Sequence, residues 1–174
     1  MNDQEVVRAQ LDRSLQAPVD VVVRCHLDLP VVTAVPPLLD DGTPFPTRYW
    51  LTCPLAVKRI ARLESAGGVR RLESYVAVRP DLGKRLAEAD FRYAEERDSL
   101  VPPGTTPAPA GGVGGNQGAG LKCLHSHYAD YAAGNDNPAG ELTAPYAEPL
   151  DCDQPCVARA DGVVTSNPDW REPG

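Results

Sequence analysis

Cysteine and histidine are the residue types in this sequence best suited to chemistry. The chain has 174 residues, with five cysteines and three histidines. Cys123, His125 and His127 fall within the segment KCLHSH, and Cys152 and Cys156 enclose the segment CDQPC. Thiolate and imidazole are the groups that most often ligate zinc in proteins. These segments therefore indicate a metal site.

The predicted metal site combines a helix with a loop. Residues 121–133 are predicted to form a helix, on which Cys123 and His127 lie about one turn apart, at about 100° per residue. Side chains four residues apart lie one above the other on a helix and can bind the same ion. Cys152 and Cys156, in a loop, would complete a closed zinc site of three cysteines and one histidine.

Other arrangements of the thiols are open. Cys25 and Cys53 follow predicted strands, and they are alternative metal ligands together with Cys123 and one histidine. Four of the five cysteines could instead hold an iron–sulfur cluster. Buried cysteines that pack as small apolar residues are the alternative without chemistry. Cys53 also precedes a predicted helix, where the helix dipole would favour its thiolate form and redox chemistry.

A glycine-rich segment, residues 111–120, runs into the helix that carries Lys122. Backbone N–H groups at a helix start, with flexible glycines and a lysine nearby, are suited to binding an anion. Gly114, Gly115, Gly120 and Lys122 are therefore candidate ligands for a phosphate-bearing molecule, although the segment lacks a phosphate-loop pattern and a flexible linker is the alternative. If the protein were an enzyme, Cys123 and His125 would be its catalytic candidates.

The pattern of elements that would position these residues predicts an α+β fold. We expect a small antiparallel sheet of about three short strands (18–24, 30–35 and 47–52) packed by four or five helices. The helices are expected at 3–16, 54–66, 69–78, 80–100 and 121–133, with mostly loop after residue 137 and one short strand at 157–164. Residues 1–165 would form one globular domain that contains the Gly/Pro-rich loop 101–120, and residues 166–174 a disordered tail.

Charge and composition limit the classes of function. The formal net charge is −7, which argues against a nucleic-acid partner, because such proteins neutralise phosphates with basic residues. No apolar stretch reaches about 20 residues, so membrane insertion is not expected. The first residues lack the apolar core of a signal peptide, which predicts a cytoplasmic protein. In that reducing compartment the thiols would be free or bound to metal.

Several of these segments resemble a bacterial family catalogued as domain of unknown function 501. The resemblance rests on residues 41–54 (DGTPFPTRYWLTCP), on Arg62-Leu63-Glu64, and on residues 122–125 (KCLH) after the glycine-rich loop. It covers residues 20 to 140 and implies no assigned activity. We therefore expect a zinc-stabilised domain that acts as a protein-interaction or regulatory module. The alternative is a small-molecule enzyme or sensor that binds a phosphate-bearing ligand at residues 111–125.

Overall fold

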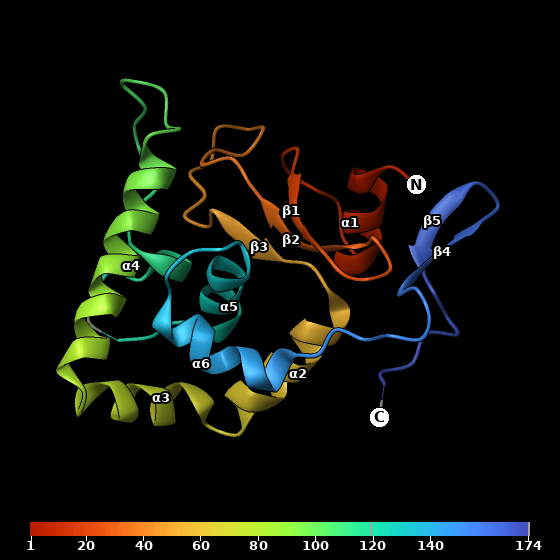
Figure 1. Cartoon of the computed structure of the whole chain (residues 1–174). Coiled ribbons are helices and arrows are strands. Elements are labelled where there is room, and N and C mark those ends of the chain that lie inside the picture. The colour runs from red at the N-terminus through yellow and green to blue at the C-terminus, as the bar shows by residue number, and fades with distance from the viewer. Residues whose placement is uncertain (119, 174) are drawn as a thin grey trace.

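A three-stranded antiparallel sheet lies at the middle of the α+β fold (Figure 1). The structure is a computed structural model that describes residues 1–118 and 120–173. The strands are β1 (Asp20–Arg24), β2 (Pro30–Ala34) and β3 (Tyr49–Leu51), in the order β1-β2-β3, with Val32 opposite Leu51. The predicted meander is thus confirmed. Every residue of β2 is buried, because helices cover both faces of this central strand.

Different helices cover the two faces of the sheet. On one face, Val7 of α1 (Asp3–Leu11) packs with Val19 and Val35. On the other face, α5 (Leu124–Ala132) places Leu124 and Tyr128 in the main core beside β2 and β3. Figure 1 shows α5 near the centre of the molecule, beside β3. The candidate site lies at the start of α5.

Three consecutive helices follow the sheet, as predicted. They are α2 (Pro54–Ser65), α3 (Gly68–Ala77) and α4 (Pro80–Asp98). Pro54 and Pro80 stand in the first turns of α2 and α4, where proline has no intrahelical hydrogen bond to lose. Gly67 separates α2 from α3 in a left-handed conformation with φ 83°. The direction of the chain therefore changes between α2 and α3 at Gly67.

The helix boundaries after residue 120 differ from the prediction. The helix α5 begins at Leu124 rather than at Leu121, because Cys123 is its extended N-cap residue. A further helix, α6 (Pro138–Ala147), occupies a segment where we expected loop. Its glycine and its internal Pro145 obscured the pattern. Asn137 caps its first turn, and Gly140 lies so close to α5 that a Cβ there would be 2.2 Å from the carbonyl oxygen of His127.

Two polar side chains of α4 hold the loop 101–120 in place. Residue 119 of this loop lies outside the described residues. Arg97 is 1% exposed and donates to the carbonyl oxygen of Gly111 at 2.6 Å. Asp90 accepts from the backbone N–H of Val113 at 2.8 Å, at the start of a short 3-10 helix, η1 (Val113–Gly115). The glycine-rich part of this loop is therefore packed against α4.

The C-terminal residues form a hairpin and return to α2. We expected one strand, but β4 (Val157–Ala160) pairs with β5 (Val163–Ser166). Asp161 and Gly162 both have positive φ in the turn, as a two-residue hairpin loop requires. Beyond the hairpin, where we expected a disordered tail, Glu172 pairs with Arg62 of α2. Residue 174 lies outside the described residues. Within the described ranges, no helix has the length and apolar character needed to cross a membrane.

Candidate metal site

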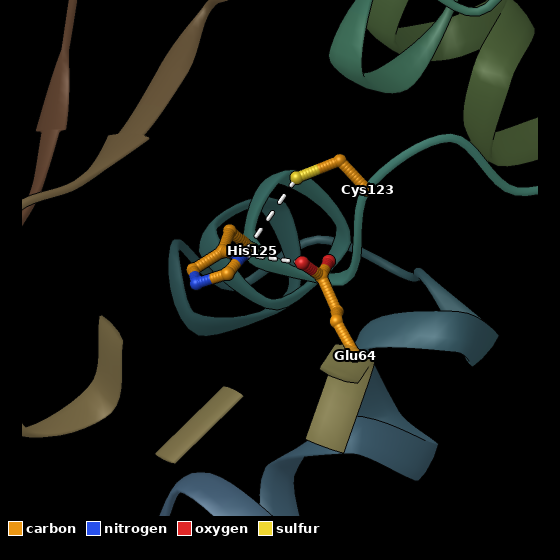
Figure 2. A group of neighbouring side chains, drawn as sticks. All are labelled: Glu64, Cys123 and His125. Carbon is orange, nitrogen blue, oxygen red and sulfur yellow. Dashed lines mark hydrogen bonds and ion pairs between the residues drawn. The ribbon is translucent and has the colours of Figure 1, made fainter. Parts of the chain in front are cut away.

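Three side chains with metal-binding atoms meet where the end of α2 faces the start of α5. They are Glu64, Cys123 and His125, and Figure 2 shows the imidazole of His125 between the other two. One atom from each lies within 4.8 Å of the other two. Among the described residues, no second group of three such side chains meets this distance.

A hydrogen bond to the backbone holds Glu64 in the site. Glu64, in the last turn of α2, accepts at Oε1 from the backbone N–H of Leu124 at 2.6 Å. Cys123 occupies the N-cap position of α5, and its side chain makes no capping hydrogen bond. The carboxylate of Glu64 therefore takes over the capping of a backbone donor that would otherwise be unpaired. This bond brings Glu64 to the side of Cys123.

The two ring nitrogens of His125 have different surroundings. The Nε2 atom lies 3.1 Å from the carbonyl oxygen of Val57, which can only accept a hydrogen bond. In the neutral ring the proton is therefore on Nε2, and the lone pair of Nδ1 is free. Nδ1 lies 3.3 Å from Oε2 of Glu64 and 3.8 Å from Sγ of Cys123. A metal-ligating histidine is typically oriented in this way by a carbonyl group on its other nitrogen.

Without a metal, the same residues favour a thiolate–imidazolium pair. Burial alone would lower the pKa of His125, but its hydrogen bond with Cys123 and the charge of Glu64 raise it to about 9. Burial alone would raise the pKa of Cys123, but its hydrogen bond with His125 lowers it. The site can therefore supply a thiolate, either to a cation or as a nucleophile.

The structure does not bring His127 to Cys123. Because Cys123 precedes the helix, with extended φ and ψ of −153° and 119°, the spacing of four residues no longer aligns the two side chains. His127 is fully buried, and its Nδ1 lies 3.1 Å from Oδ1 of Asn137. That oxygen also accepts from the backbone N–H of Gly140. His127 is thus part of the contact between α5 and α6, and burial lowers its pKa.

Cys152 and Cys156 also lie apart from Cys123. Together with Cys25 and Cys53 they line a separate small cavity. Cys53 is the N-cap residue of α2, as expected. The expected thiolate is wrong, however, because burial, with smaller contributions from the nearby Cys156 and Cys152, raises the pKa of Cys53 to about 11.

The glycine-rich segment borders the candidate site, but carboxylates occupy several backbone donors in and just after it. A Cβ on Gly114 would lie 3.3 Å from Oγ of Ser126 and 3.7 Å from Cβ of Cys123. Three carboxylates accept hydrogen bonds from backbone N–H groups here: Asp90 from residue 113, Glu73 from residue 121 and Glu64 from residue 124. A phosphate at Gly114, Gly115, Gly120 and Lys122, the expected anion site, would meet these three acidic side chains.

Sequence reasoning did not select Glu64 as a ligand. The residue lies on the polar side of α2, far from Cys123 in sequence, and its charge is ordinary for a helix surface. One signal could have identified it. Glu64 belongs to one of the segments that carry the family resemblance, and Cys123 and His125 belong to another.

Comparison with known proteins places the chain in a family without assigning an activity. No curated protein and no solved structure is significantly similar to it. One family model matches residues 21–145, which include Glu64, Cys123 and His125 but not Cys152 and Cys156. The match confirms the resemblance that residues 41–54 and 122–125 indicated. The chain therefore belongs to the family described as Protein of unknown function (DUF501).

Proposed function

We propose that this protein binds a zinc ion through Glu64, Cys123 and His125. The observation that carries the proposal is the orientation of His125, whose Nδ1 faces both the thiol and the carboxylate while Nε2 contacts the carbonyl oxygen of Val57. These three ligand types are all common in zinc proteins, and a carbonyl group behind the histidine is a usual feature of such sites.

Three protein ligands leave one position of a tetrahedral zinc ion for another group. The side chains of Glu64 and His125 are 27% and 23% exposed, so solvent reaches the site. A water molecule, or a donor atom from a second molecule, would take the fourth position. We propose on this basis that the domain acts as a protein-interaction or regulatory module, in which a partner's side chain completes the metal coordination.

Metal analysis of the protein, purified without a histidine tag or chelator, tests the proposal. We expect the variants Cys123→Ser and His125→Gln each to lose one equivalent of zinc relative to wild type. Glu73→Gln is a matched control, because Glu73 also accepts from a backbone N–H, that of Leu121, but lies outside the group of three ligands. Unchanged zinc content in Cys123→Ser and His125→Gln would refute the proposed site.

Cobalt substitution provides a second measurement that does not depend on the variants' yield. A cobalt ion bound by Cys123 gives a thiolate-to-metal charge-transfer band, and Cys123→Ser should lose it while Glu73→Gln retains it. A chelator should also lower the melting temperature, because a ligand that binds only the folded state stabilises it by about 2.7 kcal/mol at a free concentration of 100 times its Kd.

A second candidate function is thiol chemistry at Cys123, in an enzyme or a sensor. The lowered pKa of Cys123 and the raised pKa of His125 favour it. The positions of the partners favour metal binding instead. The thiol and Glu64 face the same ring nitrogen, Nδ1, whereas in a catalytic triad the nucleophile and the acidic residue contact opposite nitrogens. If the rate of alkylation of Cys123 were the same with and without a chelator, this result would support the second function.

A further inference from the structure

Four of the five cysteines converge on one cavity away from the candidate metal site. Cys25 follows β1, Cys53 lies between β3 and α2, and Cys152 and Cys156 belong to the loop between α6 and β4. All four are buried or half-buried. Segments from three distant parts of the chain therefore place sulfur atoms around the same small space.

The cavity is small and mostly apolar. Its volume is about 10 Å³, which is close to the space that one water molecule needs. Leu29, Leu55, Leu150 and Trp170 are among the residues that line it. This space accommodates a single ion and is too small for an iron–sulfur cluster.

Burial raises the pKa of Cys53 and Cys156, and two features around the cavity act in the opposite direction on these sulfur atoms. Gln10 donates from Nε2 to Sγ of Cys156 at 3.5 Å, and to the carbonyl oxygen of Pro30 at 2.9 Å, which holds its amide toward the thiol. Cys53 is the N-cap residue of α2, where the helix dipole stabilises an anion. A thiolate ligand of a metal gains from both kinds of contact.

The loop that carries Cys152 is tied to the strands beside it. Both ring nitrogens of His26 contact carbonyl oxygens of this loop, Nδ1 that of Leu150 at 2.9 Å and Nε2 that of Cys152 at 3.0 Å. Cys25 and His26 are neighbours in sequence, so this contact keeps Cys152 on the same side of the molecule as Cys25. The clustering of the thiols therefore does not depend on an ion.

We infer that Cys25, Cys53, Cys152 and Cys156 form a second, structural zinc site with four thiolate ligands. In the structure no three of these sulfur atoms lie within 4.8 Å of one another. A zinc–sulfur distance of about 2.3 Å requires the loop 150–156 to move inward. Each thiol would release its proton to solvent as it binds, so zinc uptake would acidify an unbuffered solution.

The inferred site would join parts of the chain on both sides of the family boundary. Cys25 and Cys53 lie within the matched residues 21–145, whereas Cys152 and Cys156 lie after them. One ion would thus fasten the C-terminal loop to the ends of β1 and β3. Its role would be structural, because four protein ligands leave no open position.

Zinc content of the full-length, untagged chain separates this site from that of the proposed function. If both exist, wild type holds two equivalents, Cys123→Ser holds one, and the double variant Cys152→Ser/Cys156→Ser holds one. If only the four-cysteine site exists, wild type and Cys123→Ser each hold one equivalent, and the double variant holds none. The failure of either proposal is therefore visible without the failure of the other.

Three results would overturn the inference. One is zinc content that is the same in Cys152→Ser/Cys156→Ser as in wild type. Another is a disulfide between two of these cysteines, seen as a loss of two hydrogens in the intact mass. The third is a visible iron–sulfur chromophore. Because the double variant could fold poorly, cobalt titration of wild type is the second measurement, and charge-transfer bands from two cobalt equivalents are expected, the stronger from the four-thiolate site.

Discussion

The carboxylate of Glu64 accepts a hydrogen bond from the backbone N–H of Leu124 at 2.6 Å, so the end of α2 caps the start of α5. The other oxygen of the same carboxylate lies 3.3 Å from Nδ1 of His125. Glu64 thus connects helix geometry to the chemistry of the site. The two roles can be separated by substitution.

Glu64→Gln should weaken metal binding while it preserves the helix cap. The amide oxygen still accepts from Leu124, so we expect the free energy of unfolding of the metal-free protein to stay within about 0.5 kcal/mol of wild type. Glu64→Ala removes the cap as well and should cost about 1 kcal/mol. Urea unfolding with a chelator present measures both values. Equal stability of the two variants would contradict the capping role.

Cys123 in the metal-free protein should be alkylated at lower pH than an ordinary thiol. Its hydrogen bond with His125 lowers its pKa below the usual 9.0, so the thiolate form is present at lower pH. Iodoacetamide labelling across a pH series, with peptides identified by mass spectrometry, measures the midpoint. His125→Gln should move that midpoint upward. A midpoint that does not respond to this substitution would show that His125 does not set the pKa.

Acid should destabilise the metal-free protein through His127, starting near pH 6.5. Burial lowers the pKa of His127 below 6.5 in the folded state, so below that pH the unfolded chain takes up a proton that the folded chain does not. Stability therefore falls as pH decreases from 6.5 toward the folded-state pKa, by at most about 1.4 kcal/mol per pH unit for one proton. Urea unfolding at a series of pH values below 6.5 measures how steeply the free energy of unfolding changes with pH.

His127→Gln should remove this slope, because glutamine does not titrate. A wild-type slope that persists in His127→Gln would assign the effect to groups other than His127.

Gly140→Ala should destabilise the contact between α5 and α6. A Cβ at this position would lie 2.2 Å from the carbonyl oxygen of His127 and 2.4 Å from Cβ of Tyr131, so one helix must shift. Such overpacking costs about 1–3 kcal/mol. Gly83→Ala is the matched control, since nothing lies within 4 Å of its Cβ, and it should stabilise α4 by about 0.5–1 kcal/mol. Thermal unfolding of both variants tests this difference.

The sequence predicts those elements of the fold that depend on local signals, and it does not predict those that depend on packing between distant segments. The strands 18–24, 30–35 and 47–52 were predicted from β-branched and aromatic runs, and all three exist in the predicted order. Proline at helix starts located α2 and α4. The helix α6 was missed because its stability comes from packing against α5, through Gly140, and this contact leaves no apolar period in the sequence.

The site was predicted in part for a related reason. Cys123 and His125 were selected as chemical candidates, but a helix that started at residue 121 would align Cys123 with His127 instead. A shift of the helix start to Leu124 changes the partner of the thiol. Glu64 comes from another helix, and the hydrogen bond to the backbone of Leu124 holds it beside Cys123. Such long-range contacts are not encoded by the spacing of residues.

The core of the protein extends past both ends of the family match, residues 21–145. Val7 is fully buried against the sheet, and Ala147 is fully buried in the main core. A fragment cut at the family limits would lose α1 and leave one face of β2 open to water, and it would end two residues before the end of α6. The smallest piece of this chain that can fold on its own is therefore longer than the unit by which the family is recognised.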